Sequence, residues 1–141
     1  MRPLLLDVNS LLALGWPNHQ FHHQTVARLE RRPVRRWATC ALTQIGFLRL
    51  SCNELAVGVR KTAAEALALL ETLTRDRAHV FLESSPATTR LERAFDRVLG
   101  HRQVTDAYLV ALAHHHRATL VTFDQRVEAL SHVADVVEVL R

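Results

Sequence analysis

Apolar residues in this chain occur either in short runs or at helical spacing, and the two patterns alternate along its length. Short, mainly apolar runs such as Leu4-Leu5-Leu6 predict strands buried in a sheet. The strands predicted in this way cover residues 3–7, 36–40, 80–82, 118–122 and 133–140.

Segments with an apolar residue at every third or fourth position lie between these runs and predict helices. Thr62, followed three residues later by Glu65, is a capping-box signal at the start of one of them. Ser85 and Pro86 suit the N-cap and the first position of another, which we expect to end before Gly100. The predicted helices cover residues 11–16, 19–32, 43–50, 62–73, 86–99, 106–116 and 124–130.

Strands that alternate with helices predict an α/β fold. We expect three layers, with a central, mainly parallel sheet of about five strands and helices on both of its faces. The chain has 141 residues, so we expect residues 1–141 to form a single domain. Folds of this kind place their functional sites just past the carboxyl ends of the strands.

Three aspartates stand where predicted strands and helices meet. Asp7 ends the first strand, Asp124 lies two residues after the fourth strand, and Asp106 starts the helix that leads into that strand. Three separate segments could therefore deliver carboxylates to one edge of the sheet. Hard divalent cations prefer such oxygen ligands, and a metal-bound carboxylate cluster can activate water and neutralise a phosphodiester.

Two of these aspartates also have a purely structural explanation. Asp106 could serve only as a favourable charge at a helix N-terminus, and Asp124 could serve only as an N-cap. Asp7 is harder to explain in this way, because a carboxylate directly after three leucines is unfavourable unless it has a task. The three positions together make a stronger pattern than any one of them.

The charge of the chain adds candidate phosphate contacts. The formal net charge is +4, and all but one of the 18 lysines and arginines are arginine, whose planar fork binds phosphate through two hydrogen bonds. GC-rich coding would explain the same excess. His101 and Arg102 precede the helix of Asp106, and Arg35 and Arg36 belong to a basic run that leads into the second strand. We interpret these four residues as candidate nucleic-acid contacts, with solvated loops as the alternative.

Other features narrow the possible classes of protein. Cys40 and Cys52 form no CxxC pair, which argues against a zinc knuckle and fits a reducing compartment. The sequence shows no signal peptide and no apolar stretch of membrane-spanning length, so we expect a cytoplasmic protein that does not contact membranes. His19 and His23 have the spacing of zinc-protease histidines, but the accompanying glutamate is absent.

Three stretches of the sequence resemble the motifs of PIN domains. Residues 5–12 (LLDVNSLL) resemble the opening motif, residues 104–113 (VTDAYLVALA) the central one and residues 120–124 (LVTFD) the closing one. Their order and spacing match from the first strand to the last. Further segments resemble one branch of the VapC toxins, namely residues 37–40, 42–49 and 100–106.

This resemblance implies a PIN-like fold and a type II toxin that cleaves RNA and is silenced by a VapB-type antitoxin. It implies an endoribonuclease dependent on Mg²⁺ or Mn²⁺, with Asp7, Asp106 and Asp124 as its catalytic residues and metal ligands. It also suggests that Asn9 and Thr122 support those carboxylates by hydrogen bonds, and that the protein forms a homodimer.

One position departs from the family pattern. Many PIN domains carry a glutamate in the helix after the second strand, where our register places Gly46. Gln44 is two residues away and would point elsewhere on a helix, and Glu54 lies beyond the predicted helix end. We therefore expect three acids rather than four, which leaves open whether one or two metal ions bind. A catalytically weak or inactive PIN-like module that binds RNA or protein remains the alternative.

Two other classes also place an aspartate after the first strand. A phosphotransferase of the haloacid-dehalogenase kind needs a second aspartate two residues later, where this chain has Asn9. A phosphate-accepting receiver domain needs further acids ahead of the strand-end aspartate and a lysine late in the chain, and the sequence offers neither. The metal-dependent nuclease is therefore the preferred interpretation.

Overall fold

A five-stranded sheet, parallel throughout, forms the centre of the molecule. The computed structural model describes residues 1–141 apart from residue 92. The strands lie in the order β3-β2-β1-β4-β5. They are β1 (Leu4–Leu6), β2 (Trp37–Cys40), β3 (His79–Leu82), β4 (Thr119–Thr122) and β5 (Val137–Val139). The predicted α/β fold with a parallel central sheet is confirmed.

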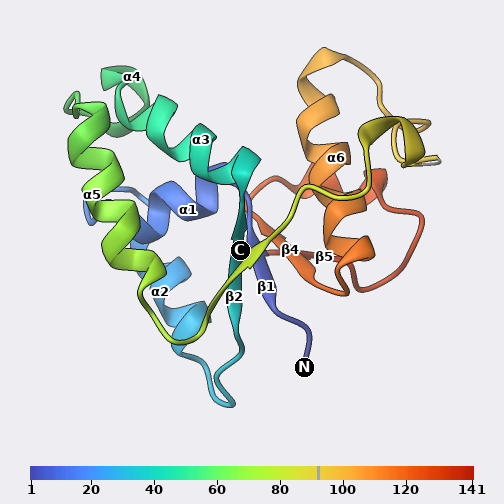
Figure 1. The fold of residues 1–141 in the computed structure, drawn as a ribbon, viewed down its shortest axis with the longest axis horizontal. Helices are drawn as coiled ribbons and strands as arrows, with labels where there is room; N and C mark the ends of the chain where they lie inside the picture. Colours follow the sequence, from blue (N-terminus) through green and yellow to red (C-terminus); the bar gives the residue numbers. More distant parts are fainter. Residues whose placement is uncertain (92) are drawn as a thin grey trace.

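Helices cover both faces of this sheet and make three layers (Figure 1). One face carries a group of five helices, and the other carries α6 (Val104–His115). The five are α1 (Val8–Gly15), α2 (His22–Glu30), α3 (Ala41–Ser51), α4 (Glu54–Val57) and α5 (Ala63–Thr74). Helices in the described part of the chain are all too short or too polar to span a bilayer.

The apolar run of β1 divides between two cores. Leu4 and Leu6 pack with residues of α1, α3 and α5, whereas Leu5 packs with residues of α6. Successive side chains of a strand point to opposite faces of the sheet, so a continuous run of leucines is what a strand covered on both sides requires.

The predicted helix over residues 86–99 is wrong for the described residues. The structure has only a short 3₁₀ turn, η1 (Thr88–Arg90), followed by irregular turns. Arg93 has a φ of 62°, a left-handed conformation that a right-handed helix cannot include. Phe95 and Val98 pack against the core on the α6 side, so tertiary contacts hold this segment in place.

The strand order reverses beside β1. The chain passes from β1 to β2 on one side of it, and β4 pairs with its other side. In parallel sheets a crevice opens between the carboxyl ends of two such strands, because the connections that leave them turn in opposite directions. The carboxyl ends of β1 and β4 therefore mark the place to look for a site.

Candidate active site

Asp7 directly follows β1 and is the N-cap of α1. The backbone N–H of Ser10 donates a hydrogen bond of 2.8 Å to its carboxylate, and the side chain is almost fully buried. Burial raises the pKa of Asp7 above its usual value, and hydrogen bonding from the Thr122 and Ser10 side chains and the Ser10 backbone opposes part of that rise. A buried carboxylate held in this way at a strand end is ready to accept a cation.

Asp124 lies just past the carboxyl end of β4 and is paired with Arg126. The Nε and Nη2 groups of Arg126 donate to the two carboxylate oxygens of Asp124 at 3.0 and 2.9 Å. This pairing holds the pKa of Asp124 below its usual value. The backbone N–H of Asp124 donates to the Thr122 hydroxyl at 3.1 Å, which fixes the direction in which the chain leaves the strand.

Asp106 lies in the first turn of α6, within range of the charges of the other two acids. Burial, followed by the negative charges of Asp7 and Asp124, raises its pKa to about 6. A small cavity of about 80 Å³ lies between α6 and η3 (Gln125–Leu130), and both Asp106 and Asp124 line it. The three segments predicted to bring carboxylates to one edge of the sheet thus place them close enough to repel one another.

This group has the donor chemistry that a divalent metal requires. All three side chains offer carboxylate oxygens, the ligands that Mg²⁺ and Mn²⁺ prefer. Among the described residues, no set of three or more acidic, histidine or cysteine side chains is already gathered closely enough to hold an ion. Because Arg126 holds both oxygens of Asp124, a metal would require Asp124 to exchange its arginine partner for the cation.

The predicted supporting residues have different surroundings. The Thr122 side chain lies between Asp7 and Asp124 and contributes to the environment of both. The Asn9 side-chain oxygen instead contacts Nε2 of His19 at 3.0 Å, because Asn9 is exposed on the first turn of α1. The structure therefore places Thr122, and not Asn9, against the carboxylates.

The predicted basic residues divide between the two edges of the sheet. Arg102 lines the cavity beside Asp106, whereas His101 precedes it in the exposed turn η2 (His101–Gln103). Arg35 and Arg36 lie ahead of β2, at the amino edge. Arg35 donates to the Arg2 carbonyl at 2.9 and 2.6 Å, and Arg36 donates to a carbonyl at the start of β3. Arg35 and Arg36 thus lie at the opposite edge from the carboxylates.

The Gly46 position faces the start of α1. A Cβ atom added there would come within 2.5 Å of a methyl group of Val8, the residue after Asp7. The amide of Gln44 donates to the hydroxyl of Thr39 at 2.9 Å and so points toward β2. Gly46 therefore lets α3 approach α1 closely beside the acids, and Gln44 does not replace the missing glutamate.

Sequence reasoning missed Arg126 and two aromatic residues. Arg126 lies two residues after Asp124. Their side chains are in contact because the chain turns between them at the start of η3. The rings of Phe21 and Phe123 stack with centroids 4.4 Å apart and join the loop before α2 to the residue ahead of Asp124. No local pattern predicts that stacking, because the two residues are far apart in the sequence.

The sequence of this chain is similar to that of a known domain family and to those of several named proteins. The sequence model of the PIN-domain family matches residues 4–135, a range that includes all three aspartates. Ribonuclease VapC39 of Mycobacterium tuberculosis is 40% identical over 137 residues, which cover 96% of this chain and 98% of that protein. Ribonuclease VapC38 of the same species is 36% identical over 127 residues, covering 90% and 89% of the two chains. Ribonuclease VapC44, also of this species, is 40% identical over 125 residues, which cover 87% of each chain.

Proposed function

Because the chain belongs to the PIN-domain family, and within it to the VapC ribonucleases, we propose that it is a metal-dependent endoribonuclease and the toxin of a toxin–antitoxin pair. One observation supports the proposal for the site. Asp7, Asp106 and Asp124 come from three separate segments beside the reversal of the strand order, and the charges of Asp7 and Asp124 reach Asp106 and raise its pKa. Their mutual repulsion has no structural benefit, and a bound cation would relieve it.

We assign Asp7, Asp106 and Asp124 as the residues that would hold Mg²⁺ or Mn²⁺. Such a cation, when bound, stabilises charge on a phosphodiester and makes water a stronger nucleophile. The protein keeps Asp7 oriented through the N–H of Ser10 and fixes the backbone of Asp124 through Thr122.

Arginines at the cavity supply the charge that the substrate needs. Three carboxylates alone would repel a polyanion, so the surrounding surface has to be positive. Arg102 lines the cavity, and the exposed Arg126 would be available to a substrate if Asp124 held a cation in its place. We assign both guanidinium groups to contacts with phosphates that flank the bond to be cut.

Cleavage of RNA by the purified protein tests the proposed activity. We expect RNA to be cut with Mg²⁺ or Mn²⁺ and to stay intact with EDTA, and we expect Asp7→Asn to be inactive, since it removes a ligand and keeps the shape of the side chain. Cleavage that continues unchanged in EDTA would show that the carboxylates do not work through a metal. A parent that binds RNA but never cuts it would favour the inactive binding module that Gly46 leaves open.

Expression in cells tests the proposed role as a toxin. We expect this chain alone to arrest growth and a VapB-type antitoxin to restore it when both are expressed. Asp7→Asn should be harmless and should still bind the antitoxin, because the substitution leaves the surface almost unchanged. If Asp7→Asn arrests growth as strongly as the parent, the arrest does not arise from RNA cleavage.

We also propose that the protein acts as a homodimer, which sedimentation of the purified chain tests.

A further inference from the structure

A groove runs along α6, between this helix and the segments that include residues 86–91 and 130–133. Its volume is about 630 Å³. Its floor is apolar and is formed by Ala107, Val110 and Ala111 of α6, together with Leu130. These three helix residues are spaced so that they share one face of α6, which has 12 residues and is about 18 Å long.

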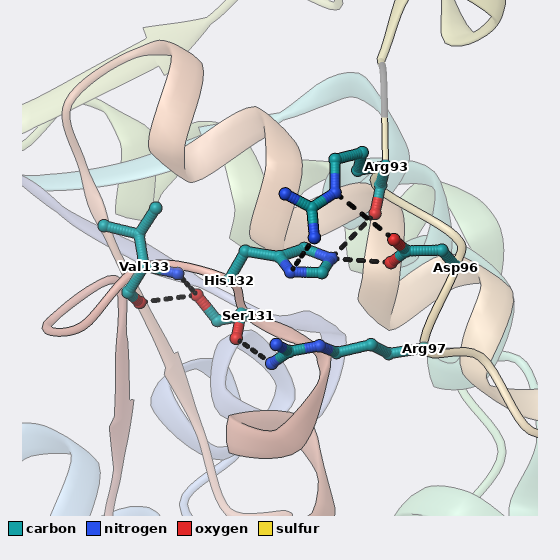
Figure 2. Close-up of polar contacts among 6 residues, drawn as sticks. All are labelled: Arg93, Asp96, Arg97, Ser131, His132 and Val133. Carbon is teal, nitrogen blue, oxygen red and sulfur yellow. Dashed lines mark hydrogen bonds and ion pairs between the residues drawn. The ribbon is translucent and has the colours of Figure 1, made fainter.

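Polar contacts hold the two segments that flank this groove against each other (Figure 2). An Nη1 group of Arg97 donates to the carbonyl of Ser131 at 2.8 Å. Nε2 of His132 lies 2.6 Å from a carboxylate oxygen of Asp96, and the ring of His132 also contacts Arg93. The irregular segment after η1 is thus fastened to the loop after η3, and this fastening gives the groove a defined wall.

The rim of the groove is basic. Arg2, Arg90 and Arg117 line it from three different parts of the chain, and His114 and His115 line it from the end of α6. All three arginines are exposed. Among the described residues that line the groove, none is acidic. Such a surface is complementary in charge to a polyanion.

The groove and the carboxylate cavity are neighbours. Leu130 lines both, and Ala107 follows Asp106 in the sequence. Because α6 leads into β4, its first turn lies at the carboxyl edge of the sheet and its histidine end lies at the amino edge. A strand that crosses the carboxylates can therefore continue along α6 without leaving the surface of the protein.

We propose that this groove binds a single-stranded segment of the RNA substrate beyond the bond to be cut, with phosphates at Arg90 and Arg117 and bases over the apolar floor. The inference rests on the proposed function and specifies in addition which surface of the protein the substrate contacts. A single strand offers both parts of this match, since its phosphates suit the rim and its bases present flat apolar faces. An acidic peptide without apolar side chains would match the rim alone.

RNA binding by matched pairs of variants tests the groove. Both pairs are made in the full-length Asp7→Asn protein, which keeps the RNA intact. The groove pair is Arg90→Gln with Arg117→Asn, because Arg117 has a φ of 55° and asparagine tolerates that conformation. The control pair is Arg75→Gln with Arg77→Gln, which removes the same charge between α5 and β3. Thermal unfolding of both pairs verifies that they are folded.

Anisotropy of a labelled single-stranded RNA is measured over a range of salt concentrations. We expect the groove pair to bind at least about tenfold more weakly than the Asp7→Asn protein, and its plot of log affinity against log salt to be shallower by about 1.4, or about 0.7 for each lost phosphate contact. The control pair should keep the affinity and the slope of the Asp7→Asn protein.

Three outcomes would overturn the inference in distinguishable ways. If the parent cuts RNA but the groove pair binds RNA like the control pair, the groove inference is wrong and the proposed function stands. If the groove pair keeps RNA affinity and loses affinity for the antitoxin, the groove is a protein interface. If the parent does not cut RNA at all, the proposed function fails and the groove inference fails with it.

Discussion

Asp106 is a residue whose charge is unfavourable in the metal-free protein. Its pKa rises from a usual 3.8 to about 6 because of burial and of the charges on Asp7 and Asp124. A folded-state pKa above the unfolded one means that the folded protein binds the proton more tightly. Stability is therefore lost as the pH rises from about 4 to about 6, and the loss is complete above that window.

We predict that Asp106→Asn stabilises the metal-free protein at neutral pH. The gain in the free energy of unfolding should be about 1–3 kcal/mol above pH 6.5 and should vanish below pH 4, where the parent is protonated. Urea denaturation at several pH values in EDTA measures it. Asp76→Asn is the contrasting control, because hydrogen bonds from Ala78 and Trp37 lower the pKa of Asp76, and its removal should destabilise the protein at neutral pH. A loss of stability for Asp106→Asn at pH 7.5 would show that the three acids do not repel one another.

Arg126 holds both carboxylate oxygens of Asp124, so a metal at Asp124 would have to displace it. We predict that Arg126→Gln binds Mn²⁺ about 2–10-fold more tightly than the parent, because it removes both the ion pair and a nearby positive charge. The same variant should bind RNA more weakly, since Arg126 is assigned to a substrate phosphate. Calorimetry gives the metal affinity, with Arg75→Gln as a control that is far from the cavity. Weaker Mn²⁺ binding by Arg126→Gln would mean that the arginine helps to assemble the site.

At the scale of single residues, the sequence predicted positions better than contacts. The three aspartates could be found because the ends of parallel strands meet at one edge. The pairing of Arg126 with Asp124, and the turning of Asn9 toward His19, depend on side-chain rotations that no spacing encodes. Arg35 and Arg36 precede β2 and therefore lie at the amino edge of the sheet, away from the carboxylates, which their position in the sequence alone did not indicate.

At the scale of helices and strands, the contact between α1 and α3 shapes the site. Gly46 of α3 faces Val8 of α1, and a Cβ atom at Gly46 would lie 2.5 Å from a Val8 methyl group. Valine is stiff about its first side-chain torsion, so it cannot easily move aside. The lack of a side chain at Gly46 therefore determines how closely α3 packs behind Asp7.

We predict that Gly46→Ala destabilises the protein by about 1–2 kcal/mol, although the same change in an exposed helix would stabilise it by about 0.5–1 kcal/mol. Adding Val8→Ala should recover stability, so that the double variant is more stable than the sum of the two single changes indicates. Urea denaturation of the four proteins completes the cycle. If Gly46→Ala is more stable than the parent, the two helices have room that the structure does not show.

The same contact determines how a fourth acid can be tested. Gly46→Glu alone would drive the glutamate stem into Val8, so we predict a poorly folded protein. Gly46→Glu with Val8→Ala should fold and bind Mn²⁺ more tightly than Val8→Ala alone, provided that the position faces the metal. Equal Mn²⁺ affinity in these two proteins would show that Gly46 does not occupy the glutamate position of other PIN domains.

Most of the regular elements were predictable, but α4 was not predicted, the last strand covers only Val137–Val139 of the predicted residues 133–140, and the connection before α6 was predicted wrongly. Buried strands and amphipathic helices can be recognised from the spacing of apolar residues along the sequence. Residues 86–99 carry a good helix start, but the φ of Arg93 and the packing of Phe95 and Val98 favour an irregular segment. Contacts distant in sequence, such as the one between Arg97 and Ser131, decide that outcome.

At the scale of the whole molecule, the fold separates charge between two neighbouring surfaces. Carboxylates gather where β1 and β4 end, and basic side chains line the groove along α6. The buried Arg28 is paired with Glu138 and ties α2 to β5 on the far side of the sheet, so it is not available to a substrate. Under the two proposals, arginines of the groove would hold a polyanion beside the acids that would bind the metal.

The proposal that Asp7, Asp106 and Asp124 form one metal site is tested most directly by calorimetry, in which Mn²⁺ is titrated into the purified protein and its variants. The parent should bind Mn²⁺, and Asp7→Asn, Asp106→Asn and Asp124→Asn should each weaken that binding by at least about tenfold, because each removes one carboxylate ligand. Asp135→Asn, ahead of β5, should bind like the parent. If the three variants bind Mn²⁺ as tightly as the parent and the control, these aspartates do not form a metal site.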